Sequence, residues 1–360
     1  MVTPMSTHSP AAPRLRPRLL SRLRPCLAAA AAAALLPLLG ACDPGGVTLG
    51  DDWSGSQLFV LAKVDGLTTV VGINPVARHA EPLAVIPSRS DDDAVVSPGI
   101  TRLSDGRWLV TIPRTKGAPS TVYAVDTQSH GLTGVGTLSN GHTLLAAGGS
   151  ALGLAGTTGS GAGKGQALLL DPASWRQQSA RTLPLAATLA AGGAHGACIA
   201  QVGTADTQVA VLDPARAGTV GAITTLKGVQ AQALDCAAGH PTVAARAAGA
   251  STGKPTVTVT HRGAVTLVTA SGGDIARVAD TAQGILAAVV VPQGVELIRM
   301  SADGTRELGR VSIGSLTGVD GMAAAGSTEV LTHDTTVATV DLTDSTVRSF
   351  SLPGTLLDAS

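Results

Sequence analysis

The sequence has few aromatic residues and few charges for its length. Of its 360 residues, 2% are aromatic and 14% are charged, whereas 44% are apolar. The aromatic stock of three Trp, one Tyr and two Phe argues against a carbohydrate-binding protein, because sugar sites usually offer aromatic platforms. The apolar content is sufficient for the core of one large domain or two ordinary ones.

The sequence also lacks an excess of basic residues outside its beginning. Five of the 25 basic residues are arginines that precede Cys42, with no acidic residue among them, which leaves 20 basic against 25 acidic residues from Cys42 onward. A mildly acidic body offers no electrostatic footprint for nucleic acid. We therefore expect no nucleic-acid partner.

No hydrophobic run is long enough to cross a membrane. The longest, LAAAAAAALLPLLGA from Leu27 to Ala41, has 15 residues and contains Pro37, whereas a spanning helix needs about 20. It follows an arginine-rich head, which is the pattern of a secretory signal peptide. Residues 1–41 are therefore predicted to be a signal peptide.

The end of this run resembles the lipobox of bacterial lipoproteins. Leu39-Gly40-Ala41-Cys42 supplies an aliphatic residue, two small residues and a cysteine. The resemblance implies cleavage before Cys42, diacylglycerol on its sulfur, often a further acyl chain such as palmitate, and lipid anchoring at the extracytoplasmic face of the cell membrane. The Gly- and Ala-rich composition resembles that of high-GC, actinobacterial proteins. The alternatives are an ordinary signal peptide with an incidental cysteine and an uncleaved anchor.

Two of the four cysteines remain once Cys26 leaves with the signal peptide and Cys42 takes lipid. Cys198 and Cys236 form an even pair in an oxidising compartment, where disulfides are stable. A disulfide between them is the expectation, and two buried free thiols are the alternative. The sequence has no C-x-x-C motif, and two sulfurs alone do not make a zinc site. We expect no metal and no cofactor.

The segment after the lipobox is rich in Gly, Asp and Ser. Residues 42–57, which include DPGGVTLGDDWSGSQ, are predicted to be a flexible tether. Trp53 is the one aromatic residue within it and a candidate to pack onto the folded body.

From residue 58 to residue 360 the sequence predicts one all-β domain. Seven segments share one template of strand, polar turn and strand, with turns at Asp65, Asp126, Asp171, Asp213, His261, Ser301 and Asp341. Most successive turns lie 40 to 48 residues apart, and a period near 40–45 with strands throughout is typical of a β-propeller. The stretches between these hairpins read as two further strands each. We expect seven four-stranded blades, with six blades plus an N-terminal hairpin as the alternative, and the sequence leaves ring closure open.

The Val-Asp-Pro-like turns resemble those of YVTN-type and quinoprotein-like propellers. The resemblance is one of pattern, and the Gly-His and Trp-Asp signatures of WD repeats are absent. The repeated aspartates need no functional explanation, because Asp side chains bond nearby backbone amides in turns.

Two short motifs predict no catalytic site in this context. Gly156 to Gln166 resembles a phosphate loop, but its spacing fails and it joins two strands. Gly249 to Gly253 matches G-x-S-x-G, but a strand follows where a nucleophile elbow needs a helix. We predict no catalytic residue.

Scattered polar residues provide a candidate site at a channel end. Inner strands of a propeller converge on its axis, where its sites usually lie. The residues that this pattern brings into consideration are His195, His240, His333, Asp235, Asp280, Asp320 and Asp334.

Two functions from different classes follow. The first is a binding or scaffolding module, held at the membrane through diacylglyceryl-Cys42, that presents a rigid disc to a protein or cell-envelope partner. The alternative is a lactonase- or hydrolase-like enzyme with several titratable side chains converging at one channel end. The scattered histidines favour binding over catalysis.

Overall fold

The structure, a computed structural model, describes most of the chain beyond its first 46 residues. The described residues are 47–86, 98–112, 119–139, 142–155, 165–171, 173–193, 195–213, 219–237, 239–249, 256–261, 264–269 and 273–359. The chain divides into two compact units, residues 1–42 and 43–360, and all described residues belong to the second. Four features of the sequence lie outside the described residues: the predicted signal peptide, Cys42, residues 156–164 of the phosphate-loop-like segment and residues 250–253 of the serine motif.

The regular elements within the described residues are all β-strands. One sheet has the order β29-β1-β2-β3, which are Thr355–Ala359, Leu58–Val64, Leu67–Asn74 and His79–Val85. The next contains β4 to β7, which are Gly99–Arg102, Trp108–Ile112, Ser120–Asp126 and Gly131–Leu138. The third contains β8 to β11, which are Thr143–Ala147, Ser150–Ala155, Gln166–Leu170 and Gln177–Thr182.

Four more sheets complete the domain. One contains β12 to β16, which are Leu189–Gly192, Ala197–Val202, Asp206–Asp213, Thr219–Val220 and Thr224–Lys227, the last two both pairing with β14. Another contains β17 to β20, which are Val229–Asp235, Thr242–Ala247, Thr256–His261 and Ala264–Thr269. The remaining two contain β21 to β24, which are Asp274–Thr281, Gly284–Val291, Gly294–Met300 and Glu307–Ile313, and β25 to β28, which are Gly321–Ala325, Thr328–His333, Thr336–Asp341 and Val347–Ser351.

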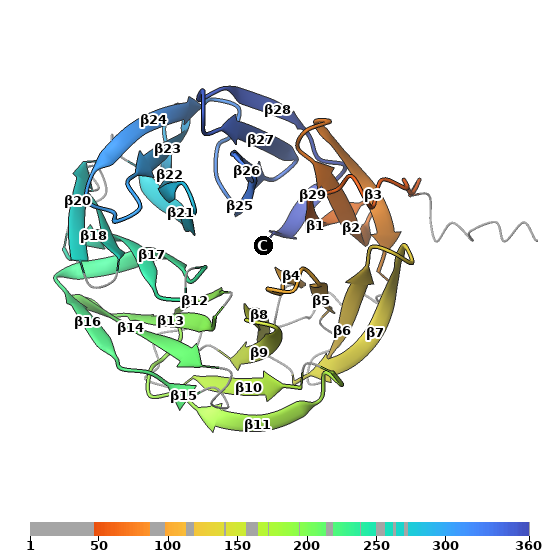
Figure 1. The fold of residues 1–360 in the computed structure, drawn as a ribbon, viewed down its shortest axis with the longest axis horizontal. Coiled ribbons are helices and arrows are strands. Elements are labelled where there is room, and N and C mark those ends of the chain that lie inside the picture. Colours follow the sequence, from red (N-terminus) through yellow and green to blue (C-terminus); the bar gives the residue numbers. More distant parts are fainter. Residues whose placement is uncertain are drawn as a thin grey trace, which may run out of the picture. The chain divides into compact units, whose positions relative to one another are not determined.

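The sheets stand around a common axis, which confirms the predicted all-β propeller (Figure 1). The strands nearest the axis are β4, β8, β12, β17, β21, β25 and β29, and each contacts its neighbours in the ring. Strand composition follows from this position. β22, inside a sheet that is covered on both faces, reads GILAAVVV and is mostly buried, whereas the outer strand β11 reads QQSART and is mostly exposed.

The sheet that joins the two ends of the chain closes the ring. Six sheets consist of consecutive strands, and in the remaining one β29 pairs antiparallel with β1, with Lys63 opposite Thr355 and Val60 opposite Ala359. The sequence left this closure open because TLLDA, at the end of the chain, is too short to be recognised as a strand alone. The repeat template was wrong at one place. The first hairpin, β1–β2, supplies middle strands of its sheet rather than the outer pair.

Close contact between neighbouring sheets depends on small residues. A Cβ atom at Gly153 in β9 would lie 2.4 Å from Leu138 Cδ1 of the preceding sheet, so the leucine side chain occupies space that only glycine leaves free. Five of the six aromatic residues are concentrated around the closing sheet, in a core that contains Trp53, Phe59, Trp108, Tyr123 and Phe350. The bulkiest core therefore lies where the two ends of the chain meet.

Residues 47–57 differ from the predicted tether of residues 42–57. Val47 and Trp53 are buried in the core of the closing sheet, and the Trp53 ring stacks on His130 with centroids 6.0 Å apart. The Gly50 N–H donates to the Pro82 carbonyl oxygen at 2.8 Å. The segment packs because burial of Trp53 removes a large apolar surface from water. The small and polar residues around Trp53 in the sequence favoured the prediction of a flexible tether instead.

Three of the repeated turn aspartates, Asp126, Asp171 and Asp341, act as predicted. In the turn after β6, the Asp126 carboxylate accepts the N–H groups of Gln128 and Ser129 at 2.9 and 3.1 Å. Asp171 and Asp341 make equivalent bonds in later outer hairpins. The hydrogen bonds to each carboxylate hold its pKa below the usual value.

Candidate functional site

A large hollow among the described residues lies on the propeller axis. It has a volume of about 970 Å³ and is lined by residues of all seven inner strands. Its charged lining consists of Arg102, Asp105, Asp235, Arg277 and Asp358. This axial cavity is the candidate site, because pockets of this size with a few convergent polar groups are where propellers and other folds bind ligands.

The predicted channel-end residues do not form one cluster. Inner strands run in the same direction, as the parallel bridge between Ala147 and Gly193 shows for β8 and β12. Asp235 and Asp280 lie at the finish of β17 and β21, whereas Asp320 precedes β25 and His333 ends β26. The two groups therefore lie at opposite ends of the channel, which we call the Asp235 end and the His333 end. The sequence analysis did not separate the residues of the two channel ends, because the sequence does not reveal the direction of each strand along the axis.

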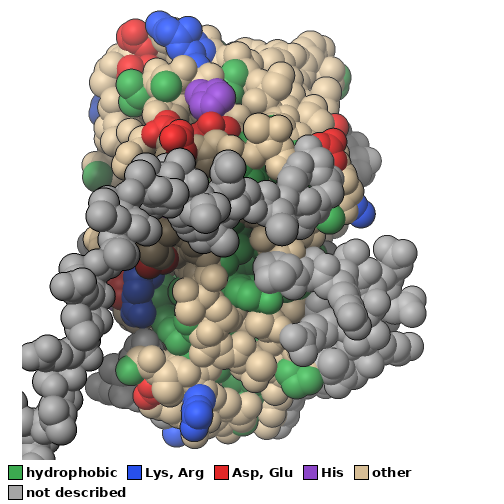
Figure 2. Space-filling view, turned by 90° about the vertical axis from the view of Figure 1, so that its right-hand side faces the viewer, with side chains coloured by type: hydrophobic (Ala, Val, Ile, Leu, Met, Phe, Trp, Pro, Cys, Tyr) green, Lys and Arg blue, Asp and Glu red, His purple; other side chains and the backbone are tan. Residues whose placement is uncertain are grey.

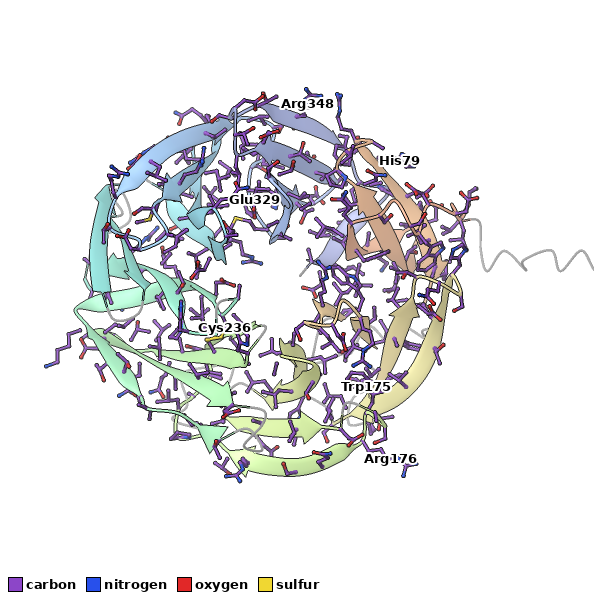
Figure 3. The ribbon with its side chains drawn as sticks, in the orientation of Figure 1. His79, Trp175, Arg176, Cys236, Glu329 and Arg348 are labelled. Atoms are coloured by element: carbon purple, nitrogen blue, oxygen red, sulfur yellow. A yellow bond between two sulfur atoms is a disulfide. The ribbon has the colours of Figure 1, made fainter. Side chains whose placement is uncertain are left out.

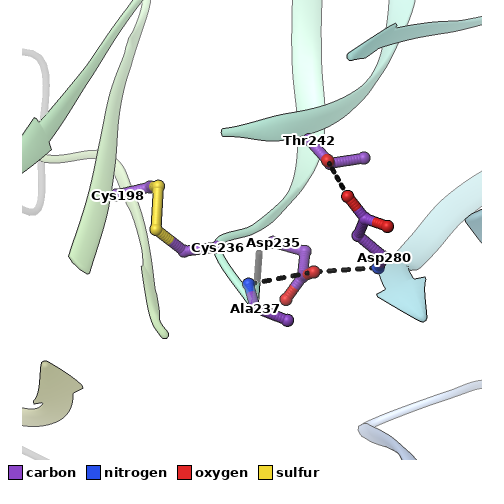
Figure 4. The surroundings of a disulfide bond; sticks show 6 residues. All are labelled: Cys198, Asp235, Cys236, Ala237, Thr242 and Asp280. Atoms are coloured by element: carbon purple, nitrogen blue, oxygen red, sulfur yellow. Dashed lines mark hydrogen bonds between the residues drawn. A yellow bond between two sulfur atoms is a disulfide. The ribbon is translucent and has the colours of Figure 1, made fainter. Parts of the chain in front are cut away.

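The Asp235 end is held together by a disulfide and by backbone hydrogen bonds (Figure 4). Cys198 and Cys236 form the expected disulfide, with their Cα atoms 5.5 Å apart. Asp235 Oδ2 accepts the N–H groups of Asp280 at 2.9 Å and Ala237 at 3.3 Å. Burial raises the pKa of Asp235, against the effect of these hydrogen bonds.

Two further contacts link the predicted residues of the Asp235 end, Asp280 and His195, to neighbouring elements. Thr242 Oγ1 donates to Asp280 Oδ2 at 3.3 Å, which links β18 to β21. Gly239, with a φ of 77°, fits against the His195 side chain, since a Cβ atom there would lie 2.9 Å from His195 Cβ. His195 and the loop that carries His240 are thus neighbours, and the contact requires glycine.

The His333 end contains a single compact polar group. His333 Nδ1 lies 2.7 Å from Asp320 Oδ2, and the Asp334 N–H donates to the same oxygen at 3.3 Å. Asp334 has a φ of 50°, so the Asp320 carboxylate holds a left-handed turn in place. This arrangement fixes the loop between β26 and β27.

Glu329 is a buried titratable residue that the sequence analysis did not single out. It lies in β26 (Figure 3), opposite Ala324 in β25 and Val340 in β27, at the end of β26 that is away from His333. It is fully buried, and neither carboxylate oxygen has a hydrogen-bond partner. Burial, and then the charge of Asp235, raise the pKa of Glu329 to about 8. A single Glu inside the buried stretch TEVLTH was the signal that could have revealed it.

Asp358 and Arg277 are two further cavity residues that the sequence did not single out. Asp358 Oδ2 accepts the Ile100 N–H at 2.7 Å, which ties the closing strand β29 to β4. Burial raises the pKa of Asp358 to about 6, although the Ile100 hydrogen bond and the charge of Arg277 oppose the rise. Arg277 also donates to the Asp320 carbonyl oxygen.

Two features are absent from the described residues. No group of three or more His, Cys, Asp or Glu side chains in these ranges is arranged to hold a metal ion. Within the same part of the chain, no helix has the length and apolar character needed to cross a membrane.

Comparison with known proteins supports the fold and no more. No protein-family model matches the chain, and no match is found among curated proteins. Among solved structures, Sqt1 from Saccharomyces cerevisiae is similar over 83% of this chain and 86% of its own, with 10% identity and a TM-score of 0.51. A prolyl endopeptidase is similar over 84% of this chain and 52% of its own, again with 10% identity and a TM-score of 0.51.

A third structure, apo AztD from Citrobacter koseri, covers 84% of this chain and 96% of its own at 10% identity, with a TM-score of 0.49. The similarity to Sqt1 and to the prolyl endopeptidase supports the class, a β-propeller, and identity this low carries no function across to this chain.

Proposed function

We propose that this protein is a bacterial lipoprotein, anchored through diacylglyceryl-Cys42 at the extracytoplasmic face of the cell membrane. Its propeller acts there as a binding or scaffolding module for a protein or cell-envelope partner. In this proposal residues 1–41 are removed, and the closing sheet counts as one blade of a seven-bladed ring.

The observation that carries the proposal is where the folded domain begins. Val47, the first described residue, is already buried in the core, and only residues 43–46 separate it from Cys42. The lipobox-like sequence therefore directly precedes a complete propeller. The Cys198–Cys236 disulfide supports the same address, because structural disulfides persist in oxidising compartments outside the cytoplasm.

Binding is favoured over catalysis by how the polar groups are used. Asp235, Asp320 and Asp358 all accept hydrogen bonds from backbone N–H groups of neighbouring loops or strands. These bonds tie neighbouring parts of the ring together, and a surface held in one conformation loses little conformational entropy when it binds a partner. One observation favours the enzyme alternative, a hydrolase or lactonase with a channel-end site: Asp235 and Asp358, whose pKa values are raised by burial, both line the axial cavity.

Replacement of the lipidated cysteine tests the anchor. Cys42→Ala should move the protein from the membrane fraction to the soluble extracytoplasmic fraction and abolish incorporation of radiolabelled palmitate. Cys26→Ala is the matched control, because Cys26 lies in the segment that is removed. Retention of the Cys42→Ala protein in membranes would contradict the lipoprotein proposal.

Crosslinking in intact cells tests the binding role. The anchored protein should yield a discrete crosslinked complex that survives substitution of Asp235 by Asn. Hydrolysis of a lactone or ester panel by the purified protein, lost in the same variant, would instead support the enzyme alternative.

A further inference from the structure

The membrane-facing side of the propeller follows from how its first residues pack. Residues 47–57, together with β3 and the turn at residues 75–78, form one outer side of the domain, which we call the entry rim. The Asp52 N–H donates to Glu81 Oε1 at 2.7 Å, and Asn74 Nδ2 donates to Asp52 Oδ2 at 3.2 Å. The first folded segment is thus fastened to β3 and to the end of β2, and it does not act as a spacer.

The remaining link to Cys42 is short compared with the domain. Five residue steps, from Cys42 to Val47, span at most about 18 Å when fully extended. A compact domain of the size of residues 47–359 has a radius of gyration of about 20 Å and is about 50 Å across. The chain is therefore too short to let the opposite side of the ring reach the lipid attached to Cys42.

We infer that the entry rim lies against the phospholipid headgroups and that the opposite rim, at β16, points away from the membrane. This inference rests on the proposed lipidation of Cys42. The order of sheets around the ring places β16 about half a turn from β3 (Figure 1). The β16 rim and both ends of the channel are then free to receive a protein partner.

The surface of the entry rim is consistent with a region that the lipid on Cys42, and not electrostatic attraction, holds near the headgroups. Leu49 is 42% exposed and Val76 is 77% exposed, two of the four large apolar side chains that stand out from the described surface. Figure 2 shows this side of the molecule, where acidic side chains are visible in the upper part together with a histidine and basic side chains. The entry rim contains the His79–Glu81 pair of β3, and Asp51 in the segment 47–57 is exposed. Carboxylates do not attract anionic headgroups, so the contact requires the lipid on Cys42.

Two matched positions make the orientation measurable. Leu49 on the entry rim and Ile223 beside β16 are both aliphatic and equally exposed, at 42% and 43%. Leu49→Cys and Ile223→Cys would each supply the single free thiol of the mature chain, because Cys198 and Cys236 are joined and Cys42 carries lipid. Val76→Cys is a second entry-rim reporter in case Leu49→Cys does not fold.

The full-length variants would be labelled with a polarity-sensitive fluorophore in membranes that contain a headgroup-quencher phospholipid. The expected result is loss of most of the emission at residues 49 and 76 and little loss at residue 223. A flexible Gly-Ser insert of about 20 residues between Gly46 and Val47, with a mean reach of about 25 Å, should abolish the difference while membrane retention persists.

The two ways to fail are separable in the same samples. Equal quenching at residues 49 and 223, or stronger quenching at residue 223, in protein that sediments with membranes would overturn the orientation alone. Protein that does not sediment with membranes at all would overturn the proposed anchoring and with it the orientation.

Discussion

The buried Glu329 should make the propeller less stable as the pH rises. Its pKa is about 8 in the folded protein against an ordinary value of 4.5. Below pH 4.5 the carboxyl group is protonated in both states, so it does not change the stability. Between pH 4.5 and 8 only the unfolded chain loses the proton, and each pH unit lowers the free energy of unfolding by about 1.4 kcal/mol. The loss is complete above pH 8.

The magnitude can be isolated with one substitution. Glu329→Met replaces the carboxyl group by an apolar side chain of similar length, in a site that offers the carboxylate no hydrogen-bond partner. Between pH 5 and 8 the native protein should lose about 4 kcal/mol that the variant does not lose. At pH 8 the variant should therefore be the more stable of the two.

The assay is urea unfolding at several pH values, followed by the emission of the buried Trp53, Trp108 and Trp175. Leu331→Met is the control. It lies on the same face of β26, conserves volume and adds no titratable group, so it should cost less than about 1.5 kcal/mol and keep the pH dependence of the native protein. Identical pH dependence in the native protein and Glu329→Met would refute the reasoning, because Asp235 and Asp358 titrate in both.

The remaining predictions concern closure and covalent linkage, in addition to the anchoring and orientation tests above. The disulfide closes a 38-residue separation, so the double change of Cys198 and Cys236 to Ala should lower the unfolding free energy by about 4 kcal/mol in the loop-entropy account. An unchanged urea midpoint would contradict this. Gly354→Ala should lower the free energy of unfolding by about 2 kcal/mol or more, because φ is 95° and the new Cβ would lie 2.4 Å from the Lys63 carbonyl oxygen. Gly326→Ala, with a φ of 66° and no atom within 4 Å, should cost only about 1 kcal/mol, and equal thermal shifts for the two would argue against steric closure at β29.

Much of the architecture follows from local pattern. Repeated strand–turn–strand segments predict the sheets, because alternating apolar residues and turn-forming aspartates act within a few residues of one another. The inner hairpins, such as β21–β22 and β25–β26, lie where the sequence places them. The pairing of Cys198 with Cys236 could also be predicted from the sequence, because only these two cysteines remain after Cys26 and Cys42 are assigned to the signal peptide and the lipid.

The candidate site was less accessible. His333 and Asp235 look alike in the sequence as polar residues that follow strands, yet they lie at opposite channel ends because their strands run in opposite directions within their sheets. Glu329 and Asp358 acquire their raised pKa values from burial by neighbouring sheets, which no local pattern records.

The sequence alone determines that this chain is built from short strands, that its turns are capped by aspartate, and that its only long apolar run ends in a lipobox-like motif. Those properties depend on neighbours in the chain. Tertiary structure decides that β29 joins β1, that residues 47–57 belong to the folded ring, and that a carboxyl group is buried without a partner at Glu329. Each of these results from contacts between residues far apart in sequence, where burial and pairing are set by the closed ring as a whole.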